Sequence, residues 1–478
     1  MAIFPSRRRL PQYCARVLGQ GVPMPPEADS GVTAPARATP AATPWPHRRR
    51  AWMVAILLSL ASIVSQFDRV VMNLTVEPVK AQFGLDDTRF ALLQGVAFGI
   101  FYTLGSVPLG RAADRFERRL VLGISMLFFS LASMASGLAR SFNELFATRV
   151  GVGIGEASVT PSGLSLLSDL FPPERLGRAV SVFFLSAPFG IGLAFIAGGS
   201  LLQALTEADA GGGLPFALQP WQAAFLIVGA PGLLLAPVLL MMREPERRGP
   251  GGKQPLSIGA VVRIVRERGH ALSLMFAGFS MVTVFNFAFN VWTPALFARV
   301  YGWNPAEVGL GFGLIMMIFG TGGTYFAGWL SDRLTRAGHV DAQLRVAAFG
   351  FLAAGAFGAL APLMPDGRLA MALIAPAMFL GCMPVPCAGT ALQLILPNRA
   401  RAQVTALYIM VISLVGIGIG PVVIGFMTDH VFTAPTDIRY SLSIVVGCAA
   451  PIMCVLLLLA LAPYRALRLR QIESEREA

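Results

Sequence analysis

Two nine-residue stretches decide the fold, GRAADRFER at residues 110–118 and GWLSDRLTR at residues 328–336. Both fit the pattern GxxxDRxxR, and each directly follows a long apolar run. Twelve such runs surround them, six before and six after a polar stretch that begins at Arg243. A motif repeated at the same place in two sets of six runs predicts two parallel, pseudo-symmetric halves.

The composition places the chain in a membrane. Hydrophobic residues make up 55% and charged residues 13% of its 478 residues, whereas about 25% of the residues of a soluble domain are charged. A helix needs about 20 apolar residues to span a bilayer. We therefore expect an all-α integral membrane protein with twelve transmembrane helices in two pseudo-symmetric six-helix bundles. The predicted spans are 52–76, 89–111, 119–138, 144–168, 177–202, 222–242, 272–298, 306–330, 344–363, 369–396, 402–428 and 440–462.

The segments between and beyond the spans divide the chain into five regions. The first is rich in Pro, Ala and Arg and is expected to be disordered. The linker between the halves contains a short basic amphipathic segment, VVRIVRERGH. The predicted regions are a cytoplasmic tail at 1–50, an N-terminal bundle at 51–243, a cytoplasmic linker at 244–271, a C-terminal bundle at 272–464 and a second cytoplasmic tail at 465–478.

The net charge of +12 follows membrane topology. Of the 38 Lys and Arg, 30 fall on the side of the termini, 6 on the opposite side and 2 inside spans. The positive-inside rule therefore places both termini in the cytoplasm, and this distribution disfavours nucleic acid as a partner. The chain shows no signal peptide, and its 36 Arg against 2 Lys and its short loops favour a bacterial cytoplasmic membrane.

The chain resembles the major facilitator superfamily over nearly its whole length. Its first half is further similar to the spinster branch, whose members are lipid transporters that handle sphingolipids or lysophospholipids. The stretches that carry this resemblance are Asp68-Arg69, PLGRAADRFERR at 108–119, RVGVGIGEA at 149–157 and SLLSDLFPPERLGRA at 165–179. The resemblance implies a secondary transporter that works by alternating access.

Four charged side chains fall well inside the predicted spans, namely Asp68, Arg69, Arg149 and Glu156. Charges at membrane depth are functional by default. At a rise of about 1.5 Å per residue, the first three reach a similar depth, and Glu156 lies two turns deeper on the helix face of Arg149. Burial disfavours a charged carboxylate and a guanidinium favours it, so small rearrangements would switch its protonation. We predict that this charged cluster couples transport to a proton gradient, without a cofactor or a metal.

In the spinster resemblance, the charged cluster corresponds to the site of the proton and the substrate head group. Arg69, Arg149 and Glu156 are therefore also predicted to bind substrate. Arg149 cannot lose its own proton, so it would hold Asp68 or Glu156 ionised in one state and an anionic head group in another. The alternative is a static ion-pair cluster that locks the first helix to the fourth.

The seventh span offers a different surface, rich in Phe and free of charge before Arg299. Asn286 and Asn290 share a helix face. With Phe289 and Trp292, they are predicted to bind an amphiphile that has a polar head and an acyl tail. The alternative is lipid-facing Phe with an ordinary amide hydrogen bond between helices.

The two GxxxDRxxR loops have a mechanical interpretation. In the superfamily resemblance, Asp114 approaches the N-terminus of the eleventh helix near Ala402 and latches the outward-open state, where the helix dipole favours a carboxylate by ~0.3–1 kcal/mol. The alternative is that the cationic loops only set topology. The predicted latch residues are Gly110, Asp114, Arg115, Arg118, Asp332 and Arg333.

Small residues and prolines mark three further spans. The stretches APFGIGLAFIAGGS from Ala187 and VGIGIGPVVIGFM from Val415 predict close helix packing rather than nucleotide binding, because neither has GxGxxG spacing or a preceding strand. Pro384 and Pro386 are expected to break the tenth span near its middle, which suggests a gate.

Other classes of function fit the sequence less well. The four histidines fall in tails, loops or span ends, so no His–carboxylate cluster of an enzyme forms at membrane depth. A channel would need rings of pore-lining residues, which two pseudo-symmetric halves do not supply. We expect a monomer that acts as a proton-coupled transporter of an amphiphilic lipid. The alternative is a proton-coupled carrier of small aromatic or carboxylic anions, which should place a basic residue in the second-half cavity.

Overall fold

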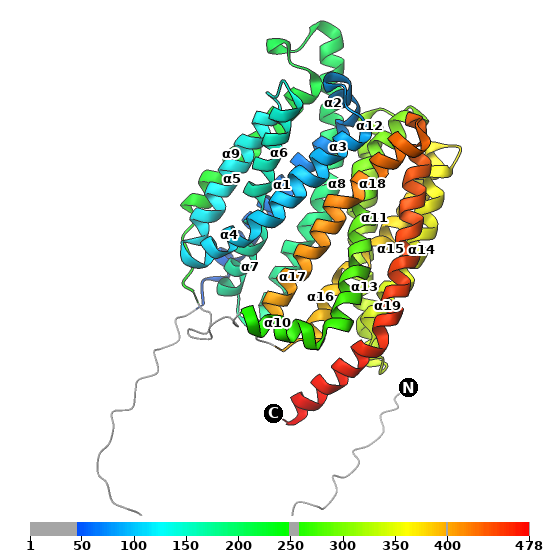
Figure 1. The fold of residues 1–478 in the computed structure, drawn as a ribbon. Helices are drawn as coiled ribbons and strands as arrows, with labels where there is room; N and C mark the ends of the chain where they lie inside the picture. Colours follow the sequence, from blue (N-terminus) through cyan, green and yellow to red (C-terminus); the bar gives the residue numbers. More distant parts are fainter. Residues whose placement is uncertain (1–44, 248–257, 398–399, 478) are drawn as a thin grey trace, which may run out of the picture. The chain divides into compact units, whose positions relative to one another are not determined.

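The computed structural model describes residues 45–247, 258–397 and 400–477. Most of the predicted N-terminal tail and the middle of the predicted linker lie outside these residues. Within them, eleven helices are long and apolar enough to cross a membrane. They form the two predicted sets, coloured from blue to green and from green to red (Figure 1).

The first half runs from α1 to α9. Several of its predicted spans are assembled from consecutive helical pieces, and the second predicted span consists of α3, η1 and α4. The elements are α1 (Arg48–Leu74), α2 (Val76–Phe83), α3 (Asp87–Leu92), η1 (Leu93–Ile100), α4 (Phe101–Arg115), α5 (Arg118–Ser136), α6 (Phe142–Glu156), α7 (Val159–Leu170), α8 (Pro173–Gly212), η2 (Pro215–Ala217) and α9 (Pro220–Met241).

The second half repeats this plan after α10, a helix that contains most of the amphipathic segment of the predicted linker. The segments η1 and η3 are both π-helical and stand before the two GxxxDRxxR motifs, as a repeat requires. The elements are α10 (Ile258–Glu267), α11 (Gly269–Tyr301), α12 (Pro305–Ile315), η3 (Met316–Gly320), α13 (Thr321–Arg336), α14 (Ala342–Leu360), η4 (Ala361–Leu363), α15 (Gly367–Cys382), α16 (Pro384–Ile395), α17 (Arg401–Ser413), η5 (Leu414–Ile419), α18 (Gly420–Phe426), η6 (Met427–Phe432), η7 (Pro435–Asp437) and α19 (Ile438–Glu477).

The predicted fourth span is broken, which is why eleven long helices rather than twelve are found. Its two pieces, α6 and α7, have 15 and 12 residues and are separated at Ala157 and Ser158. Pro161 explains the break, because it has no N–H to donate to the carbonyl of Ala157. A turn at Met383 interrupts the tenth span between α15 and α16, as its prolines predict, but its two pieces together still form one of the eleven long helices.

Two helices continue beyond the ends of their predicted spans. The helix α8 continues to Gly212, ten residues past the predicted end of the fifth span, and α19 continues to Glu477 through the predicted C-terminal tail. The hydropathy pattern places the end of a span where charged residues begin, whereas a helix continues as long as its backbone hydrogen bonds are formed. Tertiary contacts of Arg465 and Arg468 with the second half also support the extension of α19.

Glycines bring the two halves into close contact. A Cβ atom added to Gly199 of α8 would lie 2.4 Å from the carbonyl oxygen of Pro305, and one added to Gly309 of α12 would lie 2.3 Å from that of Phe195. Neither space admits a side chain. In the eleventh span, a Cβ on Gly425 would lie 2.7 Å from the carbonyl oxygen of Asp87 in the first half. The prediction that these glycines serve close helix packing is confirmed.

The halves are joined more firmly at one end than at the other. We call the end where α1 begins and α19 ends the terminal face, and the end with the turn between α2 and α3 the distal face (Figure 1). One buried apolar cluster runs through both halves and includes the distal part of α1. A second cluster, drawn almost entirely from the first half, fills its terminal part. The pieces α3 and α18 pack together near the distal face, whereas no contact of comparable extent joins the described parts of α4 and α17 near the terminal face.

Candidate functional site

The first ion pair of the charged cluster joins α1 to α6. Arg149 donates through Nη2 to Asp68 Oδ2, and both side chains are about 1% exposed. The hydroxyl of Ser133, on α5, donates to Asp68 Oδ1 at 2.5 Å. The Arg149 guanidinium also lies over the ring of Phe225 on α9, 5.6 Å from its centroid. Four helices of the first half therefore meet at this pair.

The second ion pair lies beside the first, because Arg69 follows Asp68 in α1. Arg69 donates to Glu156 Oε2 through Nε at 2.8 Å and also through Nη2. Its guanidinium lies 4.5 Å from the ring centroid of Phe98 and 5.3 Å from that of Tyr102. Glu156 is the last residue of α6, directly before the break, so the end of that helix sets its position.

The predicted cluster thus exists, but its pairing could not be read from the sequence. Depth along the helices grouped Asp68, Arg69 and Arg149 and placed Glu156 deeper. In the structure Glu156 is bound by Arg69, and Arg149 is enclosed with Asp68. Of the four side chains, Arg69 alone has substantial exposure, at 22%. In this conformation, Arg69 is therefore the cation that a solute can reach.

Both pairs retain unused hydrogen-bonding capacity. Nε and Nη1 of Arg149 and Oε1 of Glu156 are buried and have no hydrogen-bond partner among the described residues. An unsatisfied buried polar atom costs free energy, more so when it belongs to a charged group. A further acceptor beside Arg149, or a further donor beside Glu156, would satisfy these atoms.

Beside the cluster lies a polar contact that sequence reasoning missed. Gln94 Nε2 donates to Asn73 Oδ1 and, at 3.4 Å, to the carbonyl oxygen of Arg69. Phe98, Tyr102 and Ser133 were missed as well. Uncharged polar residues and single aromatic residues are common in membrane helices, so no sequence signal separates these five from their neighbours.

The predicted substrate residues of the second half divide into two groups. Asn286 and Asn290 are half-buried, and their amides donate to backbone carbonyls, that of Asn286 to Val282 at 2.9 Å and that of Asn290 to Asn286 at 2.7 Å. Asn286 also reaches the carbonyl oxygen of Gly381 at 3.4 Å, on α15. The interhelical amide bond weighed as the alternative is therefore present.

Phe289 and Trp292 do not form an accessible wall in this conformation. Both are fully buried in the core of the second half. The ring of Phe289 lies 5.1 Å from that of Phe285, and Trp292 Nε1 donates to the carbonyl oxygen of Pro421 at 3.1 Å. Here α11 is buried on several sides, and helical spacing alone could not show which aromatic residues face the core.

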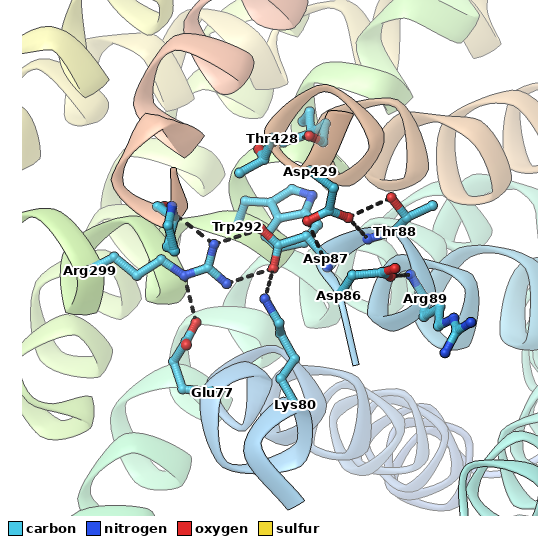
Figure 2. A network of polar contacts seen from close by, with 12 residues as sticks. Glu77, Lys80, Asp86, Asp87, Thr88, Arg89, Trp292, Arg299, Thr428 and Asp429 are labelled. Atoms are coloured by element: carbon cyan, nitrogen blue, oxygen red, sulfur yellow. Dashed lines mark hydrogen bonds and ion pairs between the residues drawn. The ribbon is translucent and has the colours of Figure 1, made fainter. Parts of the chain in front are cut away.

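At the distal face, an ion-pair network joins the halves (Figure 2). Arg299, at the end of α11, donates to both carboxylate oxygens of Asp87 at 2.7 Å and to Glu77 at 2.8 Å. Asp87 is also bound by Lys80. The side chains of Arg299 and Asp87 are 6% and 2% exposed, so this connection is shielded from water.

A second acid, which lies in the second half, completes the distal network. Asp429 of η6 accepts hydrogen bonds from the backbone N–H groups of Asp87 at 3.1 Å and Thr88 at 2.7 Å, and from the Thr88 hydroxyl at 2.6 Å. It therefore caps the helix that begins at Asp87, and the helix dipole favours a carboxylate there. Sequence reasoning missed this network, because charges at span ends are ordinary and the partners lie more than 200 residues apart.

At the terminal face, the predicted latch residues make no such connection. Asp114, Arg115, Asp332 and Arg333 are exposed, and a Cβ added to Gly110 would meet no atom within 4 Å. Within the described parts of the chain, the Asp114 carboxylate forms no hydrogen bond or ion pair. An unengaged latch is what the prediction requires of a state other than outward-open.

Arg118 has a different environment from the other latch residues. It is buried and binds Asp169 at the end of α7 and Glu244, the latter at 2.7 Å. Glu244 also accepts from the backbone N–H of Arg119 at 3.0 Å. In this conformation Arg118 therefore holds the start of the segment between the halves against its own half.

Two pseudo-symmetric helical halves that are joined at one face, with buried ion pairs inside the first half, are the construction of a secondary transporter. The chain belongs to the Major Facilitator Superfamily, whose family model matches residues 58–421. The family consists of transporters rather than enzymes.

Known relatives agree with this membership. The chain is 26% identical over 384 residues to an MFS-type efflux pump of Mycolicibacterium smegmatis, covering 80% of this chain and 85% of that protein. It is 25% identical over 395 residues to a probable L-galactonate transporter of Escherichia coli, covering 78% and 82%. It is 27% identical over 410 residues to protein spinster homolog 1 of Homo sapiens, covering 80% and 74%.

A solved structure confirms the fold. The crystal structure of a bacterial homolog of the human lysosomal transporter spinster, in an inward-facing and unoccupied conformation, matches with a TM-score of 0.74 at 23% identity. The match covers 89% of this chain and 99% of that one. The resemblance to the superfamily and to its spinster members is thereby confirmed.

Proposed function

We propose that the chain is a proton-coupled transporter that moves an amphiphilic lipid, of the lysophospholipid or sphingolipid kind, across a bacterial cytoplasmic membrane. With the cationic loops in the cytoplasm, the terminal face is cytoplasmic. The distal network then closes the outer face, and the conformation is open toward the cytoplasm.

The observation that carries this proposal is the environment of Arg69. Its guanidinium is bound by Glu156, lies over two aromatic rings and keeps part of its surface exposed. An anionic head group would compete with the Glu156 carboxylate for the same N–H groups. Protonation of Glu156 would release Arg69 to the head group, and loss of that proton would expel it. Proton and substrate occupancy are thereby linked through one side chain.

The second half supports a lipid as the substrate. The half-buried amides of Asn286 and Asn290 stand on α11 in a predominantly apolar helix, and no charged residue lies within the spanning part of α11 before Arg299. An acyl chain needs an apolar surface of this kind, whereas a small organic anion would gain from a basic residue in the second half. The relation to a probable L-galactonate transporter favours the alternative, a carrier of small organic anions.

Transport by the purified full chain in proteoliposomes tests the proposal. An imposed pH gradient would drive uptake of a radiolabelled lysophospholipid, a sphingoid phosphate, L-galactonate or an aromatic acid, with protein-free liposomes and a protonophore as controls. We expect gradient-dependent flux of one of the two lipids. Gradient-dependent flux of the acids alone would establish the alternative, and flux that the protonophore leaves unchanged would exclude proton coupling.

A further inference from the structure

A pocket of about 440 Å³ opens at the terminal face of the first half, far from the charged cluster. It lies between the start of α1, the end of α7 and the start of α8. Trp45, Arg48 and Trp52 line it from the first of these segments, and Phe171 and Arg175 line it from the other two. Three segments of the first half thus share one concave surface.

The pocket combines cationic and aromatic side chains. Arg48 and Arg175 are exposed, and neither forms an ion pair among the described residues. Among the described residues that line the pocket, none is acidic. Trp52 packs edge-to-face against Phe171, with ring centroids 5.2 Å apart and an interplanar angle of 76°. The surface therefore presents two cationic side chains beside an aromatic pair.

The position of the pocket along α1 specifies its surroundings. Arg48 is the first residue of the membrane-spanning helix, and Trp52 stands one turn further in. Arginine and tryptophan at the end of a span lie at the level of the lipid head groups. Basic pockets at this depth recognise anionic phospholipids.

We propose that this pocket binds the phosphate of an anionic phospholipid of the leaflet at the terminal face. Arg48 and Arg175 contact the phosphate, and Trp52, which packs on the buried Phe171, contacts the glycerol and the upper acyl chain. Arg69 stands 21 residues further along α1, about 30 Å away. The bound lipid is therefore separate from the transported solute, and the site does not depend on the identity of that solute. Because it touches α1, α7 and α8 together, the lipid stabilises the first half.

Thermal unfolding of the detergent-purified full chain tests the site. The chain is titrated with dioleoyl phosphatidylglycerol, with phosphatidylcholine of the same acyl chains, and with inorganic phosphate. The test variant is Arg48→Gln with Arg175→Gln. The matched control is Arg49→Gln with Arg178→Gln, which removes the same charge from exposed neighbours outside the pocket.

Phosphatidylglycerol should raise the melting temperature of the wild type and of the control, with an apparent affinity at least about tenfold weaker in the test variant. Native mass spectrometry should show one fewer retained phosphatidylglycerol in the test variant, which is a readout independent of its basal stability. An equal response of test and control variants would overturn the proposal. So would an equal effect of phosphatidylcholine, which would indicate apolar packing alone, or of inorganic phosphate, which would indicate a general anion site.

Discussion

The interior of the first half and the distal face both contain buried ion pairs, but these pairs connect different parts of the molecule. Arg149–Asp68 and Arg69–Glu156 join helices of one half. Arg299–Asp87 joins one half to the other. An interaction within a half persists whenever that half is folded, whereas an interaction between halves exists only in the state that brings them together. Removing an ion pair within a half should therefore lower the folding stability. Removing an ion pair between the halves should instead shift the conformational equilibrium.

The largest expected effect belongs to Arg149. Arg149→Ala leaves Asp68 buried with only the Ser133 hydroxyl, so the variant should lose about 3–5 kcal/mol of stability unless Asp68 takes up a proton. Thermal unfolding in detergent measures this loss. Because Asp68 is the observed partner, Arg149→Ala with Asp68→Asn should recover stability. Wild-type stability in the single variant would contradict the role given to the pair.

The same double variant decides whether Arg149 also acts in transport. If it only holds α6 to α1, stability and flux should return together. If it also binds substrate in another state, stability should return while flux stays below that of Asp68→Asn alone. Arg149→Lys sharpens the test, because a compact ammonium cannot reproduce the planar guanidinium between Asp68 and Phe225.

Arg299 should change the population of states with little loss of folding stability. Arg299→Gln removes charged hydrogen bonds worth about 1.5–3 kcal/mol from the distal-closed state alone, which corresponds to roughly a tenfold to hundredfold shift toward distal opening. Distances between spin labels across the distal face would report the shift. Arg439→Gln is the matched control, since its guanidinium contacts Tyr440 of its own helix. Equal distances in Arg299→Gln and Arg439→Gln would refute the network as a gate.

Asp114→Asn should shift the population of states in the opposite direction from Arg299→Gln, and by a smaller amount. In this conformation its carboxylate has no bond to lose, so Asp114→Asn should disfavour only the state in which the terminal face is closed. The expected shift toward the present state is ~0.3–1 kcal/mol. Spin-label distances across the terminal face measure it, with Glu117→Gln in the same loop as the control. A shift away from the present state would exclude the latch.

The smallest effect concerns Asp341, which lies outside the spans at the terminal face. Burial alone would raise the pKa of Asp341, but hydrogen bonds from Arg465 and Arg345 outweigh it and hold that pKa below its ordinary value. The contribution to stability is therefore complete above the unfolded pKa of about 4 and is lost as the pH falls through the lower folded value. Since both arginines are partly exposed, it should stay under about 1 kcal/mol. Melting temperatures between pH 5 and pH 3 should converge for wild type and Asp341→Asn, whereas Asp332→Asn should follow the wild type throughout.

The sequence predicts the fold well, because each apolar run is a local signal and the two GxxxDRxxR motifs fix the repeat. It also finds Asp68, Arg69, Arg149 and Glu156, since charge at membrane depth is rare. Which arginine binds which acid depends on helix rotation and on the break after Glu156, and neither is encoded by spacing.

The distal network was beyond sequence reasoning for a different reason. Asp87 and Asp429 stand at helix ends, where acids are common, and their contact depends on how the halves are placed in one conformation. For Phe289 and Trp292, the sequence carried a signal but could not show what it meant. An aromatic helix face looks the same in sequence whether it lines a cavity or fills a core.

The central claim is that Glu156 couples transport to the proton gradient, and the flux of the Glu156→Gln variant under a pH gradient tests it most directly. The amide is nearly isosteric with the carboxylic acid but cannot titrate, so the fold should survive while coupling is lost. In proteoliposomes, wild-type uptake of the transported substrate should rise when a pH gradient is imposed. Uptake by Glu156→Gln should be the same with and without the gradient, while exchange of substrate at equal pH continues. Gradient-driven uptake by Glu156→Gln equal to that of the wild type would contradict the account.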